Sequence, residues 1–257
     1  MDESPEIELI TAVEDHAPIL ALLSQRAFEK AAEDYEHEPW GPRGYKSAKD
    51  QLYYIDKLET YSIVYDEVIV GGLVVSDNGF GVKEIVRLFV DPDFQRNGIG
   101  SAALAKLFEV SEAKAWSAGT IKWNEANKEF LLKNGFSRIG EIKGDELYTW
   151  YTKEYEQIDL PSIKELNDKM SRVIVEGEIV EKAIPRAVRS SRAWESLTVT
   201  EATLKDASGD IVLMLWNEQI KQCAVGDHVR IEGGYVKVYR GMRQLNVGKT
   251  GKLITLD

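Results

Sequence analysis

The sequence contains few of the residues that form covalent cross-links or metal centres. Its 257 residues include one cysteine and three histidines. The single thiol, Cys223, excludes an internal disulfide, and so few soft ligands argue against a cysteine–histidine zinc site. No stretch approaches the roughly 20 apolar residues that a membrane-spanning helix needs. We therefore expect neither a bound metal nor a membrane span.

The N-terminal segment offers no secretion signal. Residues 1–6 read MDESPE, which is acidic and lacks the basic and apolar regions of a signal peptide. Apolar residues make up 44% of the chain, enough for a packed core. Together these features predict a cytoplasmic protein.

The net charge of −11 is distributed unevenly. Residues 1–160 hold 17 Lys and Arg against 30 Asp and Glu, whereas residues 161–257 hold 15 against 13. Two halves with such different charge suggest two tasks. The acidic half would repel nucleic acid and attract a basic acceptor, or its surface merely keeps the protein soluble.

The first half mixes strand and helix patterns. Apolar residues at helical spacing, caps and β-branched runs define the elements. We expect strands at Ile7–Val13, Tyr61–Tyr65, Val68–Val75, Lys83–Val90, Thr120–Trp123, Ser137–Lys143 and Glu146–Lys153. We expect helices from about Glu14 to Ala32, and at Ser47–Leu58, Gly98–Trp116 and Asn127–Lys133.

Beyond Pro161 the pattern changes to short alternating strands. We expect five, at Arg172–Val180, Leu197–Leu204, Ile211–Trp216, His228–Gly233 and Arg243–Val247, after a short helical lead-in at Ile163–Met170. Five such strands in about ninety residues predict a small antiparallel barrel. We therefore predict a first domain at residues 1–156, a linker at 157–162 and a second domain at 163–257.

The most informative stretch of the first half is Val86–Leu104. A buried strand ends near Pro92, and a turn containing Gly98 and Gly100 leads into a helix. Such glycines let the backbone approach a ligand closely, and the free N–H groups at the helix start form an anion site.

This stretch resembles the GNAT acetyltransferase superfamily, whose Arg/Gln-x-x-Gly-x-Gly/Ala loop is matched by Gln95–Gly100. A second segment, Asn124–Phe136, resembles the family's Asn…Tyr…Gly-Phe element. The resemblance covers about residues 6–155 and implies an α+β fold with a mixed central sheet and acetyl-CoA as the cofactor. It implies binding by Leu88, Phe89, Val90, Gln95, Arg96, Asn97, Gly98, Ile99, Gly100, Ser101 and Asn124.

Acetyl transfer to an amine needs a base, a polarised thioester and an acid for the leaving thiolate. We assign the base to Glu84, acting through water, although it also fits a solvent-facing strand carboxylate. The amide of Val90 would polarise the thioester. Many family members have a Tyr that acts as the general acid at the position of Leu131. Because leucine cannot donate a proton, we assign the general acid to Tyr148. Alternatively the thiolate leaves without an acid, or the domain binds acetyl-CoA without catalysis.

The segment Asp34–Tyr45 joins the first two predicted helices, a region that lines the acceptor side in the GNAT family. Its acidic and aromatic residues would suit a cationic amine. The alternative is a rigid loop in which Trp40 and Tyr45 pack onto the core.

The second half offers flat aromatic side chains beside cations, the combination that binds single-stranded nucleic acid. Trp216 ends one predicted strand, and period-two alternation puts Tyr235, Lys237 and Tyr239 on one face of another. A basic segment with three arginines, 185–194, joins the first two strands.

This half resembles the OB folds of archaeal single-stranded-DNA-binding proteins and replication protein A. The matching segments run from Val175–Val180 to Tyr239–Gly248, and the resemblance covers about residues 163–254. It implies an all-β OB-fold barrel that binds single-stranded DNA or RNA. We assign binding to Arg186, Arg189, Arg192, Trp194, Trp216, Tyr235, Lys237, Tyr239, Arg240, Arg243, Gln244 and Asn246.

Structural roles compete with each of these assignments. Trp216 also fits a core residue, the two tyrosines fit cross-strand packing, and the arginines fit a solvated turn. OB folds bind oligosaccharides and proteins too.

Three functions follow. The first is an acetyl-CoA-dependent N-acetyltransferase that acts on a protein or small-molecule amine and carries a module for single-stranded nucleic acid. The second is a DNA-binding protein whose acetyl-CoA domain is a sensor. The third is a small-molecule acetyltransferase whose barrel contacts proteins.

Overall fold

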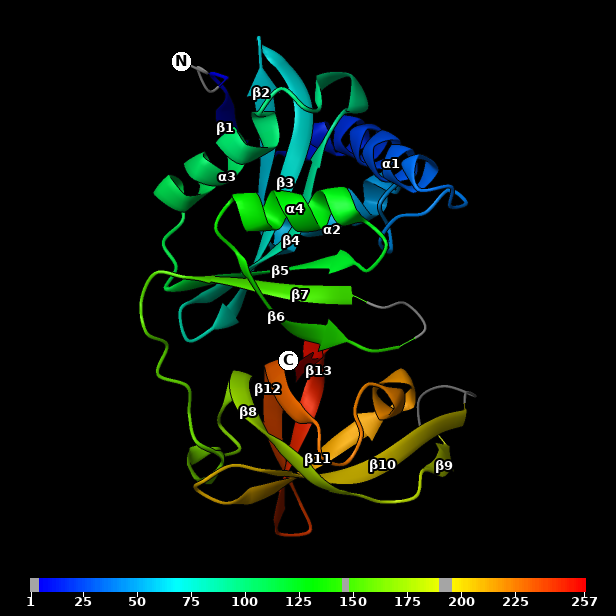
Figure 1. Ribbon diagram of the computed structural model, residues 1–257, viewed down its shortest axis with the longest axis vertical. Coiled ribbons are helices and arrows are strands. Elements are labelled where there is room, and N and C mark those ends of the chain that lie inside the picture. Colours follow the sequence, from blue (N-terminus) through cyan, green and yellow to red (C-terminus); the bar gives the residue numbers. More distant parts are fainter. Residues whose placement is uncertain (1–4, 145–147, 190–195) are drawn as a thin grey trace. The chain divides into compact units, whose positions relative to one another are not determined.

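The computed structural model describes residues 5–144, 148–189 and 196–257 (Figure 1). Its internal contacts divide the chain into two compact units, residues 1–77 with 83–137 and residues 78–82 with 138–257. The described residues form four α-helices and thirteen strands. None of the described helices is long and apolar enough to cross a membrane.

The first unit is an α+β layer structure in which β1 to β5 lie in sequence order in one sheet. β1 pairs with β2, and β2 with β3, in antiparallel fashion. The strands are β1 (Glu8–Thr11), β2 (Glu59–Tyr65), β3 (Val68–Gly79, except its last two residues), β4 (Val82–Val90, except its first residue) and β5 (Ala115–Ile121), and the helices are α1 (Ala17–Asp34), α2 (Ala48–Lys57), α3 (Ile99–Val110) and α4 (Glu125–Lys133).

Helices cover both faces of this sheet. Phe89 of β4 packs with Leu20 and Leu23 of α1, whereas the next residue, Val90, packs with Ile99 of α3. Because successive strand residues point to opposite faces, α1 and α3 lie on opposite sides. The end of β4 is therefore held between two helices.

The second unit contains β6 (Ser137–Ile142, except its first residue), β7 (Tyr148–Glu154) and a barrel. The barrel strands are β8 (Ser171–Lys182), β10 (Ser196–Lys205), β11 (Asp210–Trp216), β12 (His228–Tyr239) and β13 (Met242–Leu256). Their pairings close a ring, in the order β8, β10, β11, β13, β12 and back to β8, among the described residues. The short β9 (Arg186–Arg189) pairs with β10.

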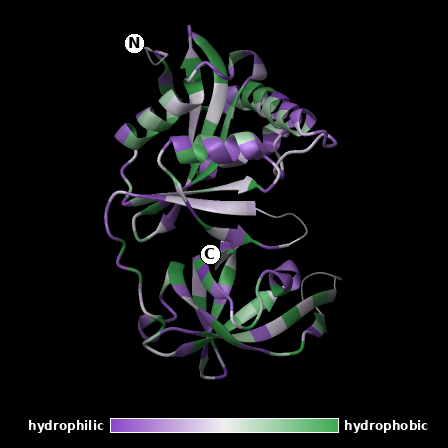
Figure 2. Ribbon diagram, in the orientation of Figure 1, coloured by the Kyte–Doolittle hydropathy of each residue, from purple (hydrophilic) through white to green (hydrophobic). Residues whose placement is uncertain are grey.

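The barrel closes over one apolar core. Alternate residues of its strands point inward, and the alternation of hydropathy is visible along β10 in Figure 2. Side chains that are at most 1% exposed line this core, among them Leu204, Leu213, Leu215, Ile231 and Leu245. This arrangement confirms the predicted α+β domain followed by an all-β barrel.

β13 continues past the barrel and pairs with β6 in the same unit. Thr255 lies opposite Glu141, and Leu256 lies opposite Gly140. A Cβ atom on Gly140 would lie 2.0 Å from the carbonyl oxygen of Thr255, so this position requires glycine.

Five element predictions were wrong. α3 ends at Val110 rather than Trp116, and β5 starts at Ala115. The lead-in at Ile163–Met170 contains only a 3-10 turn, Ile163–Glu165. β12 runs through Gly233 to Tyr239, and β13 extends to Leu256. In each case tertiary pairing or packing overrode the local signal.

Candidate functional site

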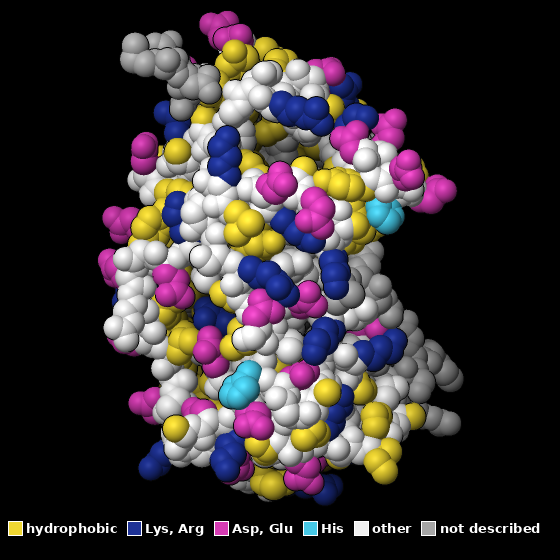
Figure 3. All heavy atoms as spheres, in the orientation of Figure 1, with side chains coloured by type: hydrophobic (Ala, Val, Ile, Leu, Met, Phe, Trp, Pro, Cys, Tyr) yellow, Lys and Arg dark blue, Asp and Glu magenta, His cyan; other side chains and the backbone are white. Residues whose placement is uncertain are grey.

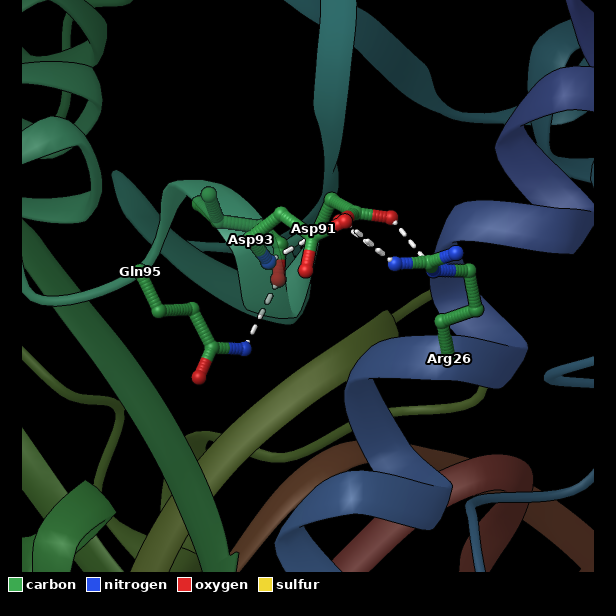
Figure 4. Close-up of polar contacts among 5 residues, drawn as sticks. Arg26, Asp91, Asp93 and Gln95 are labelled. Atoms are coloured by element: carbon green, nitrogen blue, oxygen red, sulfur yellow. Dashed lines mark hydrogen bonds and ion pairs between the residues drawn. The ribbon is translucent and has the colours of Figure 1, made fainter.

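The turn after β4 is closed by its own hydrogen bonds (Figure 4). The carboxylate of Asp91 accepts a hydrogen bond from the Asp93 amide at 3.0 Å, which caps the 3-10 turn Pro92–Phe94. The Gln95 side-chain amide donates to the carbonyl of Val90 at 2.8 Å. Gln95 thus returns to the end of β4, and the backbone after it starts from a fixed position.

The loop Gln95–Gly98 is exposed and leads directly into α3. Arg96 and Gly98 have φ of +63° and +79°, left-handed conformations that turn neighbouring N–H groups toward a common concavity. Gly98 is the N-cap of α3 and offers no side-chain oxygen to the helix. Because Gly98 does not cap the first N–H groups of α3, these groups suit an external anion, which the helix dipole also favours.

Most of the other residues assigned to the cofactor are buried or form hydrogen bonds within the protein. Phe89, Val90 and Ile99 are buried in the core, and Leu88 is half-buried. The Ser101 hydroxyl accepts a hydrogen bond from Asn134, and the Asn124 side chain caps α4 by accepting from the Asn127 amide at 3.0 Å. The structure thus places Arg96, Asn97, Gly98 and Gly100 around the start of α3 and gives Asn124 a structural task.

Glu84 and Tyr148 lie in different units. Glu84 is on β4 and only 5% exposed, so the interpretation as a solvent-facing carboxylate is wrong. Tyr148 is half-buried at the first position of β7. Leu131, where a family Tyr was expected, is 4% exposed and cannot donate a proton.

The segment between α1 and α2 packs against neighbouring residues of the domain. Tyr45 is buried, its hydroxyl donates to Glu29 at 2.9 Å, and burial and the Glu29 carboxylate together raise the pKa of Tyr45. Trp40 and His37 lie 5.6 and 4.6 Å from the ring of Trp123. Rings at these distances are in contact, so the loop packs against the rest of the domain.

One outer face of the barrel is formed by β11, β13 and β12. Paired positions on adjacent strands present their side chains on the same side of the sheet. The registers therefore place three rows on this face: Met214, Asn246 and Tyr235; Val212, Gln244 and Lys237; Met242 and Tyr239. Trp216 follows Met214 by two residues on β11, so it belongs to the same face. We call this surface the aromatic face.

The aromatic face exposes its rings. Tyr235 is 42% exposed and Tyr239 is 50% exposed, so both rings keep area open to a ligand, whereas Trp216 is half-buried. The guanidinium of Arg240 lies 5.3 Å from the centroid of the Tyr239 ring. Met242, which our assignment omitted, is 57% exposed opposite Tyr239.

Other assigned residues lie elsewhere or have other partners. The Arg243 guanidinium donates to the carbonyl oxygens of Lys164 and Leu166, and Asn246 is 7% exposed with its amide on the Gln244 carbonyl. Arg186 pairs with Glu201 at 3.1 Å. Arg192 and Trp194 lie outside the described residues, as does the side chain of Arg189.

Charges of both signs are interspersed on the face shown in Figure 3. In the view of Figure 3, basic and acidic side chains alternate over the surface without a continuous basic stripe. Within the described residues, no group of three or more His, Cys, Asp or Glu side chains could hold a metal ion.

Family models match both halves of the chain. The acetyltransferase (GNAT) family matches residues 25–136, and the family described as single-stranded DNA binding protein Ssb-like, OB fold, matches residues 161–255. No curated protein sequence matches the chain.

Solved structures resemble each half. A GNAT-family acetyltransferase from Streptococcus agalactiae is 17% identical with a TM-score of 0.52, covering 59% of this chain and 96% of that one. The PaiA N-acetyltransferase from Thermoplasma acidophilum, in complex with coenzyme A, is 15% identical with a TM-score of 0.47, covering 58% and 99%. An OB domain from Thermoplasma acidophilum is 21% identical with a TM-score of 0.34, covering 38% and 87%.

The likeness to the Streptococcus agalactiae structure shows the fold of the first half, and the two family models identify both halves. The chain therefore contains an acetyltransferase domain of the GNAT family followed by an OB-fold domain of the Ssb-like family.

Proposed function

We propose that this chain is an acetyl-CoA-dependent N-acetyltransferase whose OB domain, joined through a linker at residues 157–162, binds single-stranded DNA. One observation carries the first part. The exposed loop Gln95–Gly98 leads, through a left-handed glycine without a capping side chain, into the uncapped start of α3. A pyrophosphate fits this loop because backbone N–H groups and the exposed Arg96 supply its partners.

The chain's own residues divide the chemistry. Acetyl-CoA, when bound, supplies the activated acetyl group as a thioester. Glu84 receives the proton of the acceptor amine through a water molecule, and the amide of Val90 polarises the carbonyl. Tyr148 is the proposed proton donor to the leaving thiolate, since Leu131 cannot serve.

The experiment measures binding and turnover separately. Acetyl-CoA binding is followed by titration calorimetry, and release of free CoA is followed with a thiol reagent and a panel of protein and small-molecule amines. The only cysteine, Cys223, is buried, and burial raises its pKa, so the protein adds little thiol background. Absence of acetyl-CoA binding would refute the proposal.

Leu131 supports a second candidate function. Because this buried leucine replaces the usual acid, the domain can serve as an acetyl-CoA sensor. Binding without release of CoA, for every amine tested, would select the sensor.

The aromatic face supports the second part of the proposal. Exposed tyrosines stack on bases without sequence preference, and Lys237 and Arg240 reach phosphates. Fluorescence anisotropy of a labelled oligo-dT with the full chain measures this binding. Preference for oligo-U would make the ligand RNA, and no binding to either would favour a protein-contact module.

The dependence of oligo-dT binding on salt should be shallow. For single strands, log K falls by about 0.7 per phosphate contact for each unit of log salt, so contacts from Lys237 and Arg240 predict a slope of about −1.4. Affinity should then fall roughly sevenfold between 50 and 200 mM salt.

Titrations at four salt concentrations check this prediction. If Arg186, Arg189 and Arg192 also bind phosphates, five contacts would steepen the slope to about −3.5. A slope near zero would contradict phosphate contacts altogether.

A further inference from the structure

The Arg26 side chain on α1 contacts the turn that precedes the loop Gln95–Gly98 (Figure 4). Arg26 lies in the middle of α1, 65 residues before Asp91 in sequence. Its Nε and Nη2 atoms lie 2.8 and 3.2 Å from the two carboxylate oxygens of Asp91, and Nη2 also lies 2.8 Å from Asp93. The contact with Asp91 is bidentate, the geometry in which arginine fixes a carboxylate most firmly.

The two carboxylates differ in environment. The Asp91 side chain is 6% exposed, whereas that of Asp93 is 75% exposed. An exposed pair contributes little, so Asp93 is the minor partner. The Asp91 carboxylate is shielded from water, and removing its arginine would leave a buried charge without compensation.

Asp91 has a structural role, which explains why an acidic residue lies close to a proposed anion site. Its side chain caps the turn Pro92–Phe94, and its carbonyl oxygen accepts from the Phe94 amide at 2.9 Å. The same turn carries Gln95, the first residue of the exposed loop. Yet a bare carboxylate there repels a pyrophosphate. Arg26 cancels this charge and anchors the turn to α1 at once.

We propose that Arg26 is a positioning residue for acetyl-CoA binding, acting through Asp91 rather than on the cofactor. The inference rests on the proposed function of the loop. The Nε and Nη2 atoms of Arg26 both contact the Asp91 carboxylate, so Arg26 orients the turn and neutralises the charge of Asp91. Through Arg26, α1 on one face of the sheet therefore fixes the position of the loop at the end of β4.

The test compares four variants of the full chain by calorimetric titration with acetyl-CoA. R26Q should weaken binding about tenfold, because Asp91 then stands uncompensated. K30Q is the matched control, since Lys30 lies one helical turn further along α1, is similarly exposed, and pairs with Glu33 and Asp34. K30Q should bind like the wild type.

The rescue variant separates charge from packing. In R26Q/D91N, the amide side chain at position 91 retains an oxygen for the Asp93 backbone N–H but carries no charge. Affinity should return to within about threefold of the wild type, and D91N alone should bind at least as tightly as R26Q/D91N.

Each outcome has one meaning. Wild-type binding with unchanged affinity in R26Q would overturn the inference and leave the proposed function intact. A loss in R26Q that D91N does not rescue, or an equal loss in K30Q, would also overturn it. No binding by the wild type would overturn the function of the loop and the inference together.

Discussion

Gly98→Asp is expected to bind acetyl-CoA about 30-fold more weakly than Gly98→Asn. The position has φ +79°, which Asn and Asp tolerate better than other non-glycine residues. Both side chains have the same size and meet the same neighbour, Pro5, whose Cδ would lie 3.2 Å from the new Cβ. The two variants therefore differ only in charge at the start of α3.

The expected magnitude follows from Coulomb's law. One negative charge about 5 Å from a pyrophosphate of charge about −2 costs about 2 kcal/mol if the exposed site is nearly as polar as bulk water, with ε of about 65, and this is about 30-fold in affinity. Titration calorimetry with both variants measures it.

The thermal stability of G98D, unlike its affinity, should not fall below that of G98N. An acidic side chain at a helix N-terminus interacts favourably with the helix dipole, so the Tm of G98D should equal or slightly exceed that of G98N. A thermal melt of both variants is the control. If G98D melts well below G98N, the affinity loss reports damage to the fold. Equal affinities in two folded variants would show that the anion does not bind at this loop.

Local signals predicted the elements around this loop well. The run Lys83–Val90 became β4, and the glycines after Pro92 became the uncapped start of α3. The strands predicted on either side of Asp66-Glu67 pair as a hairpin, and both turn residues adopt positive φ, as a tight two-residue turn requires.

The end of α3 could not be predicted because no local signal marks it. Residues 111–116 contain no glycine or proline, and the helix ends at Ser111 in an extended conformation. Trp116 is 1% exposed and packs on Phe108, so burial of a large ring draws it into β5. Hydrophobic packing outweighed helix propensity here.

Long-range contacts set the parts of the site that sequence reasoning missed. Nothing in the spacing of Arg26 and Asp91 relates them, since their contact depends on how α1 crosses the sheet. Arg243 was assigned to nucleic acid by its basic charge, but alternation turns it away from Gln244 toward the carbonyl of Leu166. Charge and composition indicate a ligand class, and strand register decides which side chains share a face.

Strand register also decides which form of the protein should be tested. β13 pairs with β6 within one unit, and Lys143 of that unit pairs with Asp227 at 2.9 Å. A fragment that starts at residue 161 would lose both contacts. Binding experiments on the barrel therefore require the full chain.

The double variant Tyr235→Ala/Tyr239→Ala is expected to lose about 100-fold in affinity for oligo-dT. Stacking on an aromatic side chain contributes roughly 1–3 kcal/mol per base, so each ring should account for about tenfold. The two residues are four apart on β12, about 13 Å along the strand, which is far enough for nearly additive effects. Anisotropy titration of each single variant and of the pair measures both terms.

The matched control is Tyr235→Phe/Tyr239→Phe, which keeps both rings and removes only the hydroxyls. It should bind within about threefold of the wild type, because stacking needs the ring face. Since both tyrosines are at least 42% exposed, the alanine variant should keep a Tm close to that of the wild type. A folded alanine variant with unchanged affinity would remove the aromatic face as the binding surface. Equal loss in the phenylalanine variant would instead mean that the hydroxyls recognise the ligand by hydrogen bonding, which stacking does not require.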